Sequence, residues 1–147
     1  MKKLPDKITV DAWVHLHRTH RKLLDAVEAS LKQNELPSLN WYDVLLELRK
    51  AGAKGLRQYE IGERILLSKY NLSRLIDKLE KEQLVVRHSS EDDGRGYFVV
   101  ITDLGKQLQR EMWPVYGGTI QKEFGEKLND DESSELVRLL SKILDKK

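Results

Sequence analysis

Residues 67–108 read LSKYNLSRLIDKLEKEQLVVRHSSEDDGRGYFVVITDLGKQL, and this stretch is the most informative about the fold. Its first part predicts an amphipathic helix from Lys69 to about Gln83, because apolar residues recur there with helical spacing. These residues are Leu72, Leu75, Ile76 and Leu79. Two β-rich runs follow, LVVRH and YFVVIT, and the polar, glycine-containing loop SSEDDGRG separates them. The stretch therefore predicts a helix followed by a β-hairpin.

The polar face of this helix is its most informative surface. Ser68 is positioned to cap the first turn. At about 100° per residue, the side chains opposite or beside the apolar stripe are Tyr70, Ser73, Arg74, Asp77, Lys78 and Lys81. We expect these side chains to face solvent or a partner.

Three further helices are predicted before this stretch. A long one runs from Val10 to Leu31, where Asp11 fits the N-terminal end and one seam recurs in steps of three and four residues. The seam consists of Val10, Trp13, His17, His20, Leu24, Val27 and Leu31. The next helix runs through WYDVLLELRKAG, with Asn40 as its N-cap and Gly52 as its stop. After the loop AKGL, the short helix RQYEIGERI offers three residues for packing, Tyr59, Ile61 and Ile65.

Two more helices are predicted at the C-terminal end. In DLGKQLQREMWPVYGGTIQKEFGEKL, we expect Pro114 to kink or split the helix. In DDESSELVRLLSKILDKK, the apolar residues share one broad face that needs a covering surface. They are Leu136, Leu139, Leu140, Ile143 and Leu144.

Composition sets the outer limits of the interpretation. A chain of 147 residues fits a single domain, 1–147. The absence of cysteine excludes disulfides and thiolate metal sites. No apolar run is long enough to span a membrane and the N-terminus lacks the apolar core of a signal peptide, so we expect a cytoplasmic protein without a membrane partner. A net charge of +2 does not by itself indicate nucleic-acid binding.

Together these elements predict a mainly α fold with a small β-hairpin wing. It is a winged helix-turn-helix over residues 39–102, flanked by helices within residues 1–38 and 103–147 that serve dimerisation. The major groove of B-DNA admits an α-helix, whose N-terminal side chains then reach base edges. In this chain those positions hold Tyr70, Asn71, Ser73 and Arg74.

The sequence from residue 67 to 108 resembles the MarR family of transcriptional regulators, and the match extends over nearly the whole chain. The loop carries the family's Asp-x-Arg wing motif at Asp93, Gly94 and Arg95, and the ITDLG step into the next helix, with Thr102 and Gly105, follows the hairpin. The resemblance implies that Arg95 enters the minor groove and that Asp93 holds it in place, consistent with the attraction of arginine to a narrow minor groove. The chain departs from the family pattern at Gln83, where glycine is usual, and at Gly96 after the wing arginine. The predicted DNA-binding residues are Ser68, Lys69, Tyr70, Asn71, Ser73, Arg74, Lys78, Arg87, Asp93 and Arg95.

The flanking helices predict a homodimer. They carry long apolar stripes that a winged-helix unit of about 65 residues cannot cover. A two-fold dimer would cover them and place two recognition helices about one DNA turn apart, which predicts an inverted-repeat site on double-stranded DNA. The resemblance implies the same dimer, and a small, often anionic aromatic effector that shifts it away from its DNA-competent spacing.

The histidines at positions 15, 17 and 20 raise the question of a metal site. His17 and His20 have suitable spacing, but His15 points elsewhere and no acidic cluster lies nearby in sequence, so we expect neither a metal nor another cofactor. One interpretation places His17 and His20 near the interior, hydrogen-bonded and without function. Another places His17 in the effector pocket that the resemblance puts between the dimer helices and the winged-helix unit. The other candidates for that pocket are aromatic residues, which at helical spacing more often belong to a core: Trp13, Trp41, Tyr42 and Trp113.

The sequence offers no pairing of a nucleophile with a base and no phosphate-binding glycine loop, so it predicts no enzyme. The preferred interpretation is a homodimeric repressor that binds a pseudo-palindromic promoter site and is released by a small molecule. One alternative is a winged-helix module that contacts only other proteins. A second is a metalloprotein or hydrolase built around the three histidines.

Overall fold

A computed structural model describes residues 3–66, 71–89 and 96–145 of the chain. The chain forms two compact units. Residues 31–115 make up the central unit, and the residues up to 30 together with those from 116 onward make up the terminal unit. Each unit is described by itself.

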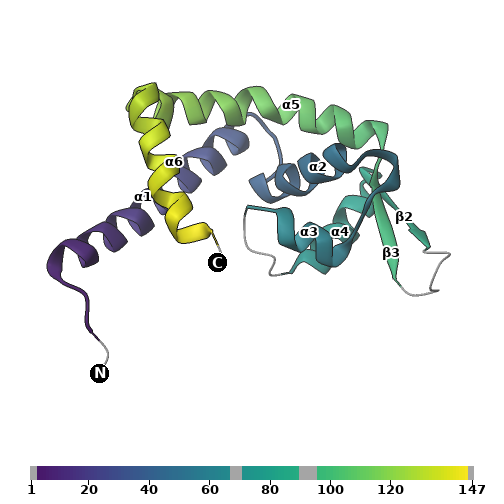
Figure 1. Cartoon of the computed structure of the whole chain (residues 1–147). Coiled ribbons are helices and arrows are strands. Elements are labelled where there is room, and N and C mark those ends of the chain that lie inside the picture. Colours follow the sequence, from purple (N-terminus) through teal and green to yellow (C-terminus); the bar gives the residue numbers. More distant parts are fainter. Residues whose placement is uncertain (1–2, 67–70, 90–95, 146–147) are drawn as a thin grey trace. The chain divides into compact units, whose positions relative to one another are not determined.

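The central unit is built around α2, Leu39–Ala51 (Figure 1). The helix begins directly after Ser38, so the expected N-cap Asn40 lies inside the first turn instead. Gly52 ends α2 as predicted, because its φ of 71° suits glycine and not the residues of a continuing helix. A short 3-10 turn, η1 (Gly52–Lys54), leads away from it.

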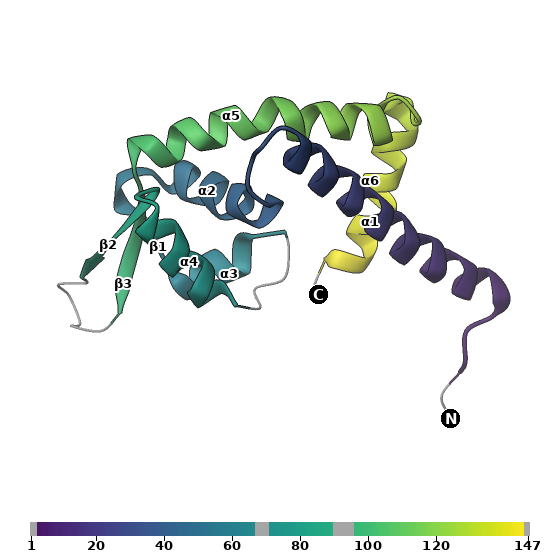
Figure 2. The same cartoon turned by 180° about the vertical axis from the view of Figure 1, so that it is seen from behind.

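Two shorter helices pack beside α2. They are α3, Gln58–Arg64, and α4, Leu72–Lys81. In both views of the chain, α2 lies between α5 and the α3–α4 pair (Figures 1 and 2). Side chains from these helices and from the sheet exclude water from one continuous core. Its most deeply buried members are Val44, Leu45, Leu48, Leu56, Ile61, Ile76, Leu79 and Val85.

The apolar stripe predicted for the recognition helix is confirmed, but the helix is shorter than expected. Leu72, Ile76 and Leu79 are buried. α4 begins at Leu72, not at Lys69, and ends at Lys81, not at Gln83. In α3, Ile61 is buried as expected, whereas Tyr59 was wrongly expected to pack and is 65% exposed.

The sheet has three antiparallel strands in the order β1-β3-β2. The predicted hairpin is confirmed as β2, Val85–Ser89, paired with β3, Tyr97–Ile101. The third strand, β1, consists only of Leu56–Arg57, where the end of a loop and the first residue of the short helix were expected. Gly55 precedes it at a φ of 69°, and a Cβ there would overlap the backbone carbonyl of Val99 on β3. The close approach of β1 to β3 therefore requires glycine.

The helix after the hairpin is α5, Asp103–Ile120. It runs through Pro114 without ending, so the expected split at this proline is not observed. The α-helical pattern changes only after Ile120, where a π-helical turn, η2 (Gln121–Gly125), follows.

The terminal unit contains most of α1, Lys7–Gln33, the end of α5, η2, and α6, Asp130–Leu144. α1 begins at Lys7, four residues before Asp11, where its N-terminal end was expected. Asp11 instead lies inside the helix and pairs with Lys7 at 2.8 Å. The α6 N-terminus is a capping box, because the Asn129 side chain accepts from the Glu132 N–H and the Glu132 carboxylate accepts from the Asn129 N–H.

The seam predicted for α1 is buried only toward its C-terminal end. Val27 and Leu31 are buried, whereas Trp13 is 64% exposed. His17 and His20 are exposed as well, so their predicted interior position is wrong for the single chain. On α6, Val137, Leu139, Ile143 and Leu144 are also exposed to solvent. None of the helices in the described ranges is both long and apolar enough to cross a membrane.

Candidate nucleic-acid interface

The exposed face of α4 is the centre of the candidate interface. Ser73, Arg74 and Lys78 are all exposed, on the side of the helix opposite its buried leucines. This arrangement follows from the amphipathic sequence, since the apolar side chains of α4 are buried in the core and the polar ones remain on the other side. A hydroxyl, a guanidinium and an ammonium group are thereby available to a negatively charged partner.

The start of α4 has an unusual backbone conformation. Asn71 precedes the helix in the left-handed region, with a φ of 63° and a ψ of 23°, and its side chain makes no capping hydrogen bond. Asparagine tolerates this conformation better than most residues. The expected cap Ser68 and the predicted contacts Lys69 and Tyr70 lie outside the described residues.

The hairpin next to α4 supplies the second part of the interface. Its ladder pairs Val85 with Ile101 at the base and Ser89 with Tyr97 at the outer end. Tyr97 and His88 are exposed there. The predicted wing residues Asp93 and Arg95 lie outside the described residues.

Arg87 connects β2 to the recognition helix. Its guanidinium donates to Asp77 and to Glu80 on α4, each at 2.7 Å. Burial lowers the pKa of Arg87, but its hydrogen bonds to the two carboxylates outweigh burial and raise that pKa above its ordinary value. Arg87 therefore offsets part of the negative charge of two acids on α4, and its predicted contact with DNA stays a prediction.

Arg57 is a candidate that sequence reasoning missed. It lies on β1 directly opposite Phe98, and its guanidinium carbon is 4.5 Å from the centre of that ring. Stacking on an aromatic face holds a guanidinium in place. A cavity of about 430 Å³ beside it is lined by Arg57, Gln58, Tyr59, Arg87, Gly96, Tyr97 and Val99. The only signal in the sequence was a leucine and an arginine after Gly55, too short a run to predict a strand.

The ITDLG step joins the end of the recognition-helix segment to α5. The Thr102 hydroxyl donates to the Gln83 carbonyl at 2.7 Å and accepts from the Gly105 N–H at 3.0 Å. A Cβ at Gly105 would overlap the backbone carbonyl of Leu84. Gln83 adopts a φ of 65°, so the left-handed turn forms although glycine is absent. The structure therefore explains why this motif contains a threonine, which makes both hydrogen bonds, and a glycine, which leaves room for the Leu84 carbonyl.

Comparison with known proteins identifies the family. A family model described as the MarR family matches residues 37–96. The HTH-type transcriptional regulator YkoM of Bacillus subtilis is 30% identical over 136 residues, which cover 90% of this chain and 86% of YkoM.

The chain belongs to the MarR family.

Solved MarR-family structures share its fold. AbsC, a MarR family transcriptional regulator from Streptomyces coelicolor, is 26% identical and superimposes with a TM-score of 0.82 over 97% of this chain and 96% of AbsC. Sco3205, a MarR family transcriptional regulator from the same organism, was solved in complex with DNA. It is 19% identical and has a TM-score of 0.87, with 98% of this chain and 90% of Sco3205 covered. The predicted winged helix-turn-helix fold is confirmed.

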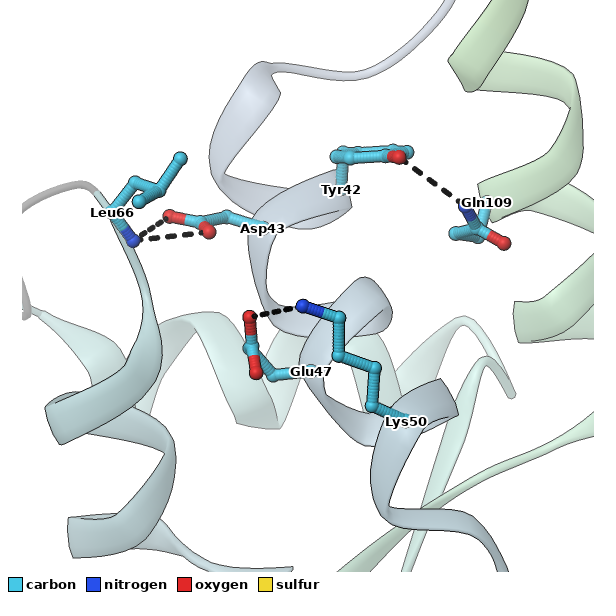
Figure 3. A network of polar contacts seen from close by, with 6 residues as sticks. All are labelled: Tyr42, Asp43, Glu47, Lys50, Leu66 and Gln109. Carbon is cyan, nitrogen blue, oxygen red and sulfur yellow. Dashed lines mark hydrogen bonds and ion pairs between the residues drawn. The ribbon is translucent and has the colours of Figure 1, made fainter. Parts of the chain in front are cut away.

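The residues predicted for a MarR effector pocket fall into two groups. In the central unit, Tyr42 on α2 and Trp113 on α5 are stacked, with ring centroids 6.2 Å apart and an interplanar angle of 20°. The Tyr42 hydroxyl accepts from the buried Gln109 amide at 3.3 Å (Figure 3). Trp41 packs against the core instead. In the terminal unit, the rings of Trp13 and His17 lie 4.4 Å apart.

The three histidines of α1 show no metal-binding arrangement. Within the ranges that the structure describes, no three histidine, cysteine, aspartate or glutamate side chains gather where they could hold a metal ion. His15 makes a 2.8 Å hydrogen bond through Nδ1 with the Asp11 carbonyl. The histidine-based hydrolase therefore gains no support from the geometry.

An apolar groove lies within the terminal unit, between α1 and α6. It has a volume of about 670 Å³. Its lining residues are Thr9, Ala12, Trp13, His15, Leu16, Thr19, His20, Leu23, Phe124, Leu136, Leu140 and Ile143. The uncovered stripes of α1 and α6 therefore border a concave surface and not a flat one.

Proposed function

We propose that this MarR-family DNA-binding regulator binds a pseudo-palindromic promoter site as a homodimer and represses transcription from it. The observation that carries the proposal is the face of α4, where Ser73, Arg74 and Lys78 are exposed beside the hairpin. An amphipathic helix with donors on its outer side fits the major groove, where arginine can donate two hydrogen bonds to guanine. Sco3205, which shares the fold, was solved in complex with DNA, and this supports DNA binding as the use of the fold here.

The homodimer is supported by the terminal unit. Trp13 on α1 and Ile143 on α6 are 64% and 75% exposed in the single chain, at the border of the apolar groove. Large apolar patches on soluble proteins are commonly covered by a partner, and two-fold symmetry lets one surface cover its own copy. Sedimentation of the full chain tests this: a dimer at micromolar concentration is expected, and a monomer throughout would contradict it.

DNA recognition is tested by the affinity for the DNA upstream of the protein's own gene, against a scrambled duplex at near-physiological salt. Nanomolar binding with a large gap over the scrambled duplex is expected. Weak, equal binding of the two duplexes would favour the alternative in which the winged helix contacts only proteins.

The role of Arg74 is tested on the operator found in that way. Arg74→Ala should cost about 1–3 kcal/mol and relax the preference for one base pair, if this side chain reads a base. Arg95→Ala should weaken binding with less effect on the major-groove preference. Arg110→Ala removes the same charge from an exposed position on α5 and serves as the control. Parent-like binding by both Arg74→Ala and Arg95→Ala would overturn this docking arrangement.

We further infer that a small aromatic or anionic molecule releases the protein from DNA. Trp113, which stacks on Tyr42 and is 48% exposed, supports this, because an exposed aromatic ring can contact an aromatic ligand. A panel of aromatic carboxylates, added to the preformed DNA complex, should contain at least one that lowers operator affinity. We place this function in the cytoplasm, where promoter DNA is accessible.

A further inference from the structure

The middle of α2 contains a charged residue where a core residue is expected. Asp43 is only 5% exposed and is followed directly by the completely buried Val44 and Leu45. Burying a carboxylate is costly unless hydrogen bonds replace its water. An apolar side chain would fill the same position without that cost, so the carboxylate needs another explanation.

The carboxylate of Asp43 is directed at the backbone that leaves α3. The Leu66 N–H donates to both of its oxygens, at 2.8 Å to Oδ2 and 3.1 Å to Oδ1 (Figure 3). Leu66 lies just beyond Ile65, the extended residue that terminates α3. The Leu66 side chain is 80% exposed, so α2 holds the backbone at this position and not the side chain.

This contact lies at the beginning of the connection to the recognition helix. Five residues separate Leu66 from Leu72, the first residue of α4, and Asn71 enters that helix in a left-handed conformation without a side-chain cap. Because the helix start is not fixed by its own N-cap side chain, its placement depends on how the preceding connection is anchored. The hydrogen bond from Leu66 to α2 anchors one end of that connection to the core.

We propose that Asp43 is a positioning residue for DNA recognition, which sets the α3–α4 connection so that Arg74 and Ser73 reach base edges. The inference rests on the proposed DNA-binding function. Asp43 does not touch DNA in this proposal, and its hydrogen bond from the Leu66 N–H is the contact through which it acts on the connection. Its loss should therefore lower discrimination between operator and scrambled duplex, while the affinity for scrambled DNA, which depends on phosphate contacts, should change little.

Two substitutions separate positioning from simple core packing. Asp43→Leu fills the core but cannot accept a hydrogen bond, and should lose about 10- to 100-fold in operator affinity, the range of one or two specific base contacts. Asp43→Asn keeps an acceptor oxygen and should stay within about threefold of the parent. Asp43→Ser, whose oxygen is too short to reach, replaces Asp43→Leu if that variant does not fold.

The control for charge is on the same helix. Glu47→Gln also removes one negative charge from α2, from a side chain that pairs with Lys50 at 3.5 Å, whereas the Leu66 N–H is bonded to Asp43 (Figure 3). Its discrimination between the two duplexes should equal that of the parent. If Glu47→Gln raises the affinity for both duplexes equally, this gain measures the effect of removing one negative charge, and it is subtracted from the affinity changes of the Asp43 variants.

Amide hydrogen exchange distinguishes failure of this inference from failure of the proposed function. The Leu66 amide should be protected in the parent and in Asp43→Asn, and should exchange faster in Asp43→Leu, whether or not the protein binds DNA. A parent that does not distinguish operator from scrambled DNA defeats the proposed function and, with it, this role of Asp43. Unchanged discrimination in a folded Asp43→Leu, or complete loss of it in Asp43→Asn, would overturn the positioning role alone.

Discussion

The central and terminal units differ in how they use their apolar residues. In the central unit, leucines from α2 and α4 are excluded from water, and even a carboxylate is buried among them. In the terminal unit, α1 and α6 leave tryptophan, isoleucine and leucine side chains in solvent. Apolar residues with the same helical periodicity therefore form a closed core in one unit and an exposed surface in the other.

The largest expected effect separates these two cases directly. Leu45→Ala should lower the free energy of unfolding by about 2–5 kcal/mol, because it leaves a cavity in a core that is already closed. Leu139→Ala on α6 should instead raise the dimer dissociation constant about tenfold or more. Urea unfolding measures the first and sedimentation the second. A cost to unfolding from Leu139→Ala that does not vary with protein concentration would remove the distinction between the units.

A pair of glycine substitutions should show opposite signs. Gly105→Ala should destabilise the protein by about 1–3 kcal/mol, because the new methyl group overlaps the Leu84 carbonyl and the Ile101 side chain. Gly118→Ala on α5 meets no atom within 4 Å and should stabilise by about 0.5–1 kcal/mol, as alanine does inside a helix. Thermal unfolding of both variants checks the signs. Destabilisation by Gly118→Ala would indicate that a partner chain occupies the space beside it.

A smaller effect is expected at the left-handed turn after α4. Gln83→Gly should stabilise the central unit by about 0.5–1 kcal/mol, because glycine relieves a φ of 65° at some cost in chain entropy. Urea unfolding of the variant measures the change, with operator affinity as a check that the wing is undisturbed. A loss of stability would mean that the glutamine side chain contributes contacts worth more than the strain.

The smallest effect concerns the first turn of α1. The hydroxyl of Thr9, followed by its backbone N–H, lowers the pKa of Asp6 below 3.8. A carboxyl whose pKa is lower in the folded than in the unfolded state stabilises the folded protein at pH values above its unfolded-state pKa. The contribution of Asp6 should therefore be present above about pH 4 and be lost as the pH falls through its folded-state pKa. An NMR titration of the Asp6 carboxyl, compared in parent and Thr9→Val, measures it. An unchanged Asp6 pKa in Thr9→Val would exclude the hydroxyl as the cause.

Sequence periodicity predicted the elements that are determined by residues close to one another in the sequence. The apolar stripe of α4 and the two strands of the hairpin are visible because each pattern repeats within a few residues. The start of α4 was placed three residues early, because the sequence does not show that Asn71 adopts a left-handed conformation. Pro114 was expected to kink or split a helix, and α5 runs through it without ending.

The parts that could not be predicted depend on partners distant in sequence. The buried Asp43 carboxylate accepts hydrogen bonds from the backbone N–H of Leu66, which lies 23 residues away in sequence. Arg57 gains its position from pairing with Phe98, and Arg87 from two acids on α4. The interpretation that placed His17 and His20 near the interior was wrong for the single chain. A helical stripe in the sequence does not show whether the surface that covers it belongs to the same chain or to another.

The Thr102 hydroxyl has a mechanical consequence. One oxygen atom bonds the residue that closes the α4 turn and the first turn of α5, at 2.7 and 3.0 Å. A displacement of the first turn of α5 would therefore either carry the Gln83 carbonyl with it or break this hydrogen bond. Thr102 thus couples the N-terminal turn of α5 mechanically to the turn that follows α4.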